Sequence, residues 1–233
     1  MAALQGSQDG CATKLPAILQ PMPRGWFITF EGGEGTGKST QIERLAGRLR
    51  ERGREVVVTR EPGGTPLAEG VRALLLDPAH ELDGLTEIFL LEAARHDHVE
   101  RVIRPALEAG AVVISDRYLD STLAYQGHGG QLGVEELRPV GRFATGGLRP
   151  DLTILFDVPV EVGLARKSDA ETTRFEAHFD LAFHERVRAG YLARAAAEPD
   201  RWVVVDATAP EEDVLAAARS VLVAFLDRVA PAR

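Results

Sequence analysis

The sequence lacks the features of several protein classes. It contains a single cysteine, Cys11, among 233 residues, which excludes an internal disulfide framework and is typical of a reducing cytosol. No apolar run approaches the length of a membrane span, and residues 1–21 lack the cationic start and long apolar core of a secretory signal. We therefore expect a cytoplasmic protein that does not associate with membranes.

Positive charge is also scarce relative to negative charge. The 27 lysines and arginines are outnumbered by 35 aspartates and glutamates, which gives a net charge of −8. This balance argues against a protein that coats nucleic acid or an anionic membrane surface. It is compatible with a local basic pocket, and we expect a small-molecule substrate. With 45% apolar residues, the chain is able to bury a substantial core.

A phosphate-binding loop (P-loop) of the form G-x-x-x-x-G-K-[ST] occupies residues 32–39. The aromatic and β-branched residues 26–31 before it predict a strand, and apolar side chains at helical spacing over 40–51 predict a helix. In this context backbone N–H groups converge on an anion at the helix N-terminus, Lys38 reaches the β- and γ-phosphates and Ser39 binds Mg²⁺. We expect ATP and Mg²⁺ as cofactors. The predicted nucleotide-binding residues are Gly32, Gly33, Glu34, Gly35, Thr36, Gly37, Lys38, Ser39 and Thr40.

Strand and helix patterns alternate along the rest of the chain. Short, β-branched and almost entirely apolar runs, typical of parallel strands covered on both faces, span residues 26–31, 55–60, 111–116, 151–157 and 201–206. Helical patterns lie near residues 37–51, 66–77, 84–109, 120–128, 133–145, 159–168, 176–197 and 210–229. The alternation predicts an α/β fold with a doubly wound, five-stranded parallel sheet. We expect one domain over 26–229, after a loosely packed extension over 1–25 in which Met22 is a second candidate start.

Polar residues at the carboxyl ends of these strands are candidate site residues, because ligands of such sheets bind there. Asp116 and Asp157 each close a strand, and an acidic residue in this position of a P-loop protein commonly holds the Mg²⁺ shell. The pattern leaves the choice open, and we prefer Asp116. Arg117 offers a planar fork for a phosphate. Arg60, before a Pro-Gly-Gly turn, is suited either to a phosphate pocket or to a plain strand-to-helix turn.

Several helical residues are further candidates. Thr122 and Gln126 share one helical face and are able to present hydrogen-bonding groups to a base. Arg95, on an otherwise apolar helix, needs an anionic partner, for which a bound phosphate or a carboxylate would serve equally well. His96 and His98 point to different faces, so we interpret them as surface or pocket-rim residues and not as a metal pair.

An interruption of the helical pattern at residues 166–174 contains the cations Arg166, Lys167 and Arg174. These side chains are suited to close over a triphosphate as a lid, over about residues 166–175, and to exclude water during transfer. A solvated charged loop is equally compatible with the composition.

Taken together and in order, these segments resemble the thymidylate kinases, which phosphorylate dTMP to dTDP with ATP in dTTP synthesis. The resemblance covers about residues 26–207. The motifs that carry it are Phe30 to Thr40, Thr59 to Thr65, Ala94-Arg95 with His98-Val99, Asp116-Arg117-Tyr118 with Ser121 to Gln126, Arg149 to Thr153, and Asp157-Val158-Pro159.

The resemblance implies roles for individual residues. Glu34 matches the acidic residue that faces the sugar 3′-hydroxyl and places the chain with the bacterial type. Arg95 and Arg117 match positions near the acceptor nucleotide, with Arg117 on its phosphate. Thr122 and Tyr125 match positions beside the base and the deoxyribose.

The chain departs from the family pattern at two places. An aromatic residue that stacks on thymine usually stands four positions before Arg95, where this chain has Leu91, and Phe89 is offset from that position on the helix. The lid is also shorter and poorer in arginine than the bacterial pattern. The resemblance further implies a homodimer through apolar helices, including 84–109.

The expected mechanism supplies positive charge through Lys38, Mg²⁺, Arg117 and the lid cations Arg166 and Arg174. A monophosphate acceptor is largely dianionic near neutral pH and needs no general base. A deoxynucleoside kinase, which must activate a neutral hydroxyl, is the main alternative because Glu61 is available as its base; another monophosphate kinase is a second. A nucleotide switch is disfavoured, since the sequence has no Asn-Lys-x-Asp segment.

Overall fold

We describe the fold from a computed structural model, which describes residues 24–166 and 179–229. The predictions made for residues 1–23, and those for the lid residues Lys167 and Arg174, lie outside these ranges. The prediction of one domain with an N-terminal extension stays a prediction.

Five parallel strands form one sheet in the order β2-β3-β1-β4-β5. They are β1 (Phe27–Glu31), β2 (Val56–Arg60), β3 (Val112–Asp116), β4 (Leu152–Asp157) and β5 (Trp202–Asp206). Each begins one residue after the start that the sequence predicts and ends at the predicted residue, so the predicted fold class is confirmed. Because β1 lies between β3 and β4, the loop that leaves its carboxyl end is central in the molecule.

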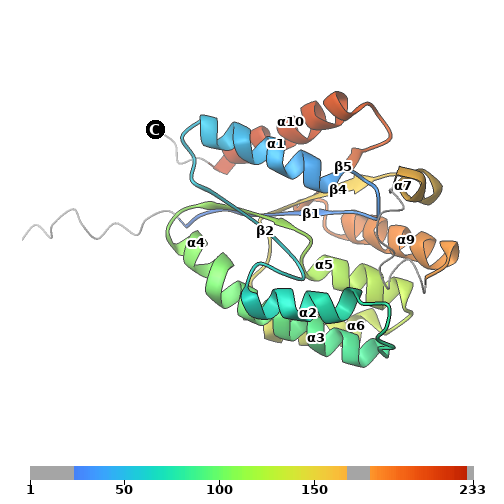
Figure 1. The fold of residues 1–233 in the computed structure, drawn as a ribbon. Coiled ribbons are helices and arrows are strands. Elements are labelled where there is room, and N and C mark those ends of the chain that lie inside the picture. The colour runs from blue at the N-terminus through green and yellow to red at the C-terminus, as the bar shows by residue number, and fades with distance from the viewer. Residues whose placement is uncertain (1–23, 167–178, 230–233) are drawn as a thin grey trace, which may run out of the picture.

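Helices cover both faces of the sheet, with α1 and α10 on one face and most of the others on the opposite face (Figure 1). The helices are α1 (Lys38–Glu51), α2 (Pro66–Leu76), α3 (Gly84–His98), α4 (Arg104–Glu108), α5 (Leu119–Thr122), α6 (Val134–Ala144), α7 (Val160–Arg166), α9 (Leu181–Ala197) and α10 (Glu211–Val229). Among the described residues, no helix combines the length and the apolar character that crossing a membrane requires.

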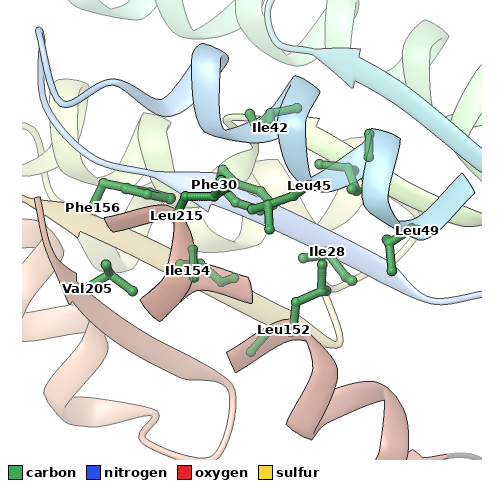
Figure 2. Close-up of a cluster of buried hydrophobic side chains, with 14 of the residues drawn as sticks. Ile28, Phe30, Ile42, Leu45, Leu49, Leu152, Ile154, Phe156, Val205 and Leu215 are labelled. Carbon is green, nitrogen blue, oxygen red and sulfur yellow. The ribbon is translucent and has the colours of Figure 1, made fainter. Parts of the chain in front are cut away.

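Alternation along the strands divides the core between these two faces. Ile28 and Phe30 of β1 pack with Leu45 of α1 and Leu215 of α10, as Figure 2 shows. Phe27, the residue before Ile28, points to the other face and joins a cluster with Leu107 of α4 and with Tyr118. Both faces of β1 are therefore covered, as its continuous apolar sequence predicts.

Two predicted helices contain π-helical segments. The predicted helix 84–109 is continuous, but a π-helical segment, Val99–Ile103, joins α3 to α4. The predicted helix 120–128 begins as α5 and continues as a second π-helical segment, Leu123–Gly129. Such segments often occur at functional sites, and the second one carries Tyr125 and Gln126.

Candidate active site

A cavity of about 190 Å³ opens beside the carboxyl ends of the strands. Seven of the predicted substrate-binding residues line it: Glu34, Leu91, Arg95, Arg117, Thr122, Tyr125 and Gln126. We call it the acceptor cavity. Arg60 lies instead in the neighbouring groove with Ser39 and Asp116, where it pairs with Glu69 at 3.0 Å.

Arg72 of α2 also lines the acceptor cavity, and sequence reasoning missed it. Its guanidinium donates a hydrogen bond to the Pro62 carbonyl at 3.0 Å. Burial lowers its pKa, and the charge of Arg60 adds to that effect. Nothing in the local pattern of α2 distinguishes Arg72 from a surface cation, because only tertiary packing brings α2 to the cavity.

The P-loop turns tightly because glycines within it adopt positive backbone φ angles. Gly35 and Gly37 have φ of 64° and 80°, which residues with a Cβ rarely adopt. A Cβ on Gly35 would also lie 1.8 Å from the Gly163 carbonyl oxygen of α7. Glycine is therefore required at position 35 both by conformation and by the close approach of another helix.

Lys38 lies inside this curl, at the start of α1. Its Nζ donates hydrogen bonds to the carbonyl oxygens of Gly32 at 3.1 Å and Gly33 at 2.9 Å, and to Thr36 Oγ1 at 3.1 Å. Burial lowers its pKa to about 8, and the positive charge of Arg117 adds to that shift. The amine is thus held where the loop would cradle a phosphate.

Ser39 and Asp116 come together as predicted for a metal site. Ser39 Oγ donates to Asp116 Oδ2 at 2.7 Å, because β3 pairs with β1 and brings Asp116 level with Phe30. The second oxygen, Asp116 Oδ1, is buried and accepts no hydrogen bond from the described residues. A hydroxyl and an unsatisfied carboxylate oxygen are donors suited to a hydrated Mg²⁺.

The alternative metal residue, Asp157, is engaged elsewhere. Arg188 of α9 donates to both its carboxylate oxygens, at 2.8 and 2.9 Å. No group of three His, Cys, Asp or Glu side chains with metal-binding geometry occurs within the described ranges. A cation at Ser39 and Asp116 would therefore draw its remaining ligands from phosphate and water, as Mg²⁺ commonly does in nucleotide sites.

Arg117 joins the P-loop to the acceptor cavity. Its Nη1 donates to the Gly32 carbonyl oxygen at 3.1 Å, and its Nη2 donates to Glu34 Oε1 and to Tyr125 Oη, each at 3.1 Å. Its backbone adopts a φ of 72°, which is uncommon for a residue other than glycine. Burial opposes its charge, but Tyr125 and further partners outweigh that effect and raise its pKa well above the usual value.

Arg95 finds carboxylates as its partners, which decides between the two alternatives left open by the sequence. Its Nε donates to Glu61 at 2.7 Å, Nη1 pairs with Glu92, and Nη2 donates to Thr122 Oγ1 at 2.8 Å. Burial acts against its charge, but the two carboxylates outweigh burial and raise its pKa. Since Arg95 is 3% exposed yet lines the cavity, its charge reaches the cavity as part of a buried network.

His98 belongs to the same network, and its interpretation as a surface or pocket-rim residue is wrong. It is fully buried, with Nδ1 3.0 Å from Glu61 Oε1 and Nε2 2.6 Å from Thr59 Oγ1. Its partners Thr59 and Glu61 lie on and just after β2, far from His98 in the sequence, so the local pattern does not reveal this burial. His96, in contrast, is exposed, as predicted for a surface residue, and its Nδ1 lies 2.9 Å from the Ala144 carbonyl oxygen.

The remaining residues singled out from the sequence lie at the wall of the acceptor cavity or outside it. Gln126 donates to Glu87 at 2.5 Å and Leu91 is 8% exposed, so both are fixed at the wall of the acceptor cavity. Phe89 is 64% exposed and does not line that cavity, as its offset on the helix predicts. Arg166 ends α7, where its guanidinium donates to the Ala207 and Thr208 carbonyl oxygens.

Comparison with known proteins agrees with this geometry. A thymidylate kinase family profile matches residues 30–218. The chain belongs to the thymidylate kinase family. It is 59% identical to the thymidylate kinase of Thermomicrobium roseum over 81% of this chain and 90% of that one. It is 53% identical to the enzyme of Caulobacter vibrioides over 87% and 98%, and 51% identical to that of Desulfovibrio desulfuricans over 87% and 97%.

Family membership confirms the resemblance predicted from the motifs. Thymidylate kinases are phosphotransferases, so the prediction of an enzyme is confirmed as well. The disfavoured switch or binding-module alternative finds no support among these relatives.

Proposed function

We propose that this chain transfers the γ-phosphoryl group of ATP to dTMP, with Mg²⁺, and forms dTDP for dTTP synthesis. The observation that carries the proposal is the hydrogen bond from Arg117, in the acceptor cavity, to the carbonyl oxygen of Gly32, the first P-loop residue. The guanidinium proposed to bind the acceptor phosphate is therefore in direct contact with the loop proposed to bind the donor phosphates. Phosphoryl transfer needs this juxtaposition above all, because catalysis consists mainly of positioning and charge stabilisation.

On the donor side, the P-loop amides and Lys38 would bind the ATP phosphates. Ser39 and Asp116 would hold Mg²⁺, which neutralises charge on the phosphates when bound. We assign the metal to Asp116 because one of its carboxylate oxygens is buried and accepts no hydrogen bond from the described residues. Both oxygens of Asp157 accept hydrogen bonds from Arg188 instead.

On the acceptor side, Arg117 would bind the dTMP phosphate and Glu34 with Tyr125 would lie beside the deoxyribose. Tyr125 Oη donates to Glu34 Oε1 at 2.9 Å, which orients both groups at one end of the cavity. Arg95, Thr122 and Gln126 offer hydrogen-bonding groups to the base, and Leu91 supplies apolar contact in place of an aromatic ring.

The contacts of Glu61 support a monophosphate acceptor over a nucleoside. Its two oxygens are taken by Arg95 and His98, so it is poorly placed to act as the base that a neutral hydroxyl would need. A dianionic phosphate needs no such base.

Two finer assignments belong to this proposal. Arg166 and Arg174 are our candidates for the cation that stabilises the transferring phosphoryl group, although Arg166 is bonded to carbonyl oxygens and Arg174 lies outside the described residues. We also propose that the enzyme is cytoplasmic, in line with its single cysteine.

We further propose a homodimer through α2, α3 and α6. These neighbouring helices (Figure 1) expose the large apolar side chains Leu67, Leu74, Leu85, Phe89 and Phe143. A second copy of the chain would cover these exposed apolar side chains, which are typical of a protein–protein contact when they lie on neighbouring helices.

An acceptor panel tests the proposed reaction. With ATP and Mg²⁺, we expect turnover with dTMP far above that with dCMP, AMP or thymidine, and dUMP is included to measure the contribution of the thymine methyl group. A coupled assay for ADP gives the rates. Preference for thymidine over dTMP would overturn the monophosphate assignment, and ATP hydrolysis independent of any acceptor would favour a switch.

A further inference from the structure

Tyr191 of α9 reaches the acceptor side of the site without lining the acceptor cavity. Its side chain is 1% exposed, and its ring packs edge to face against Tyr125, with ring centroids 6.3 Å apart. Arg117 Nη1 donates a hydrogen bond to Tyr191 Oη at 3.1 Å. Tyr191 therefore touches the guanidinium that we assign to the acceptor phosphate, from the side away from the cavity.

The hydroxyl of Tyr191 is oriented by the buried carboxyl group of Glu31. It donates to Glu31 Oε2 at 3.1 Å, and Ser121 Oγ, 2.7 Å from Tyr191 Oη, donates to the same oxygen at 2.5 Å. A tyrosine has one hydroxyl proton. Because that proton is directed at Glu31, the lone pairs of the oxygen are left for the cation of Arg117.

Glu31 is itself held firmly at the end of β1. It is fully buried, and its other oxygen accepts a hydrogen bond from the Tyr118 backbone N–H at 2.9 Å. Gly32, the next residue, accepts from Arg117 through its carbonyl oxygen. The end of the central strand, α5 and α9 thus converge on one edge of the guanidinium, although Glu31 and Tyr191 are 160 residues apart.

The backbone of Arg117 indicates that this position is imposed by its surroundings. Its φ of 72° costs conformational energy that a side-chain network must offset. Its Nη2 faces Glu34 and Tyr125, which line the cavity, whereas its Nη1 faces the buried groups. Nη1 is therefore anchored by buried groups, whereas Nη2 lies among residues that line the acceptor cavity.

We propose that Tyr191 is a positioning residue for the acceptor: with Glu31 and Ser121, it anchors the Arg117 guanidinium where the acceptor phosphate binds. This inference rests on the proposed function, since it concerns the residue assigned to the dTMP phosphate. It makes α9 a part of the acceptor site through a contact that substrate does not share.

Tyr191→Phe tests the proposal, because it removes the hydroxyl and keeps the ring. We expect KM for dTMP to rise about tenfold, the scale of one hydrogen bond to a charged group, while KM for ATP stays within about twofold. The matched control is Thr29→Val, which removes another buried hydroxyl contact, 2.9 Å from Thr153 Oγ1, in the sheet core away from Arg117. An equal rise in both KM values, or the same rise in the control, would overturn the proposal.

Binding measured by calorimetry separates positioning from general loss of structure. Tyr191→Phe should weaken dTMP binding about tenfold and leave thymidine binding unchanged, because thymidine lacks the phosphate that Arg117 holds. Ser121→Ala should shift dTMP affinity in the same direction and provides a second variant should the first fold poorly. Equal loss for both ligands would refute the role of Tyr191, whereas a wild-type protein that phosphorylates no dTMP would instead refute the proposed function.

Discussion

At the scale of single residues, the site is built from ionisable groups taken out of water. Glu31, Lys38, Glu61, Arg95 and His98 are all less than a tenth exposed. Burial of a charge is costly unless partners compensate for it, and each of these side chains has at least one hydrogen-bonding partner. The groups are therefore already oriented before a ligand binds, which is what charge stabilisation in phosphoryl transfer requires.

Lys38→Ala should reduce kcat by about a hundredfold or more, the scale at which removal of one stabilising group acts on a transition state. The fold should persist, because the amine contacts only loop oxygens and a hydroxyl. Steady-state kinetics with dTMP and circular dichroism check the two parts. Near-normal turnover would contradict the role of Lys38.

Glu31 should make stability depend on pH. Burial, with a smaller contribution from Asp120, raises its pKa from 4.5 to about 8 in the folded protein. Between these values the folded state binds more protons at this site than the unfolded chain, so the free energy of unfolding should fall as pH rises from about 4.5 to about 8. The slope from one group is at most about 1.4 kcal/mol per pH unit.

Glu31→Gln should remove that contribution, so stability of the variant relative to wild type should increase with pH across this window. Urea unfolding followed at several pH values measures the difference. Glu43→Gln, in a side chain exposed to solvent, is the control. A constant difference between Glu31→Gln and wild type would show that Glu31 does not titrate in this range.

At the scale of elements, the P-loop is supported by a helix distant in sequence. α7 packs its Gly163 against the loop so closely that a Cβ there would lie 2.4 Å from the Glu34 carbonyl oxygen. The same contact is seen from the other side at Gly35. The loop therefore depends on a small residue in α7 for its shape.

Gly163→Ala should cost about 1–3 kcal/mol, as overpacking does, and should raise KM for ATP because the loop must shift. Gly47→Ala in α1 is the matched control, since its added Cβ meets nothing within 4 Å and replacement of an interior helical glycine should stabilise by up to about 1 kcal/mol. Thermal unfolding and ATP kinetics of both variants check these expectations. Unchanged KM for ATP in Gly163→Ala would show that the loop does not need this contact.

At the scale of the whole molecule, hydrogen bonds connect α2 to α3 and α3 to α6, while these helices expose large apolar side chains. Thr65, the N-cap of α2, donates to Asp97 of α3 at 2.6 Å, and His96 of α3 lies 2.9 Å from the Ala144 carbonyl oxygen at the end of α6. These hydrogen bonds hold the three helices together, yet Phe89 and Phe143 on them are 64% and 89% exposed. A second copy of the chain, related by two-fold symmetry, would bury both side chains.

Phe89→Glu should convert the proposed dimer to a monomer, because a charge would be buried without a partner at the interface. Light scattering coupled to size-exclusion chromatography measures the mass. Val204→Glu introduces the same charge at another exposed apolar position, on β5, and should remain dimeric. A wild-type mass equal to that of one 25.2 kDa chain would remove the dimer from the proposal.

The sequence by itself determined the order of strands and helices, the P-loop and the family. Each depends on contiguous residues: a strand such as 111–116 is recognisable from its own apolar run, and the P-loop from eight consecutive positions. Periodicity and short motifs involve only residues that are near one another in the sequence, so they are recognisable without knowledge of the tertiary structure. The positions of Lys38, Ser39 and Asp116 were predictable for the same reason, since the ends of parallel strands share one edge.

Only the tertiary structure decided how the charged residues are paired. Arg95 was compatible with phosphate or carboxylate until β2 placed Glu61 beside it, and Asp116 and Asp157 were equivalent until Arg188 engaged one of them. The burial of His98 and the anchoring of Arg117 by Tyr191 likewise join residues far apart in the chain. Hydrogen bonds and ion pairs act over a few ångströms in space, so no local pattern specifies which distant partner completes them.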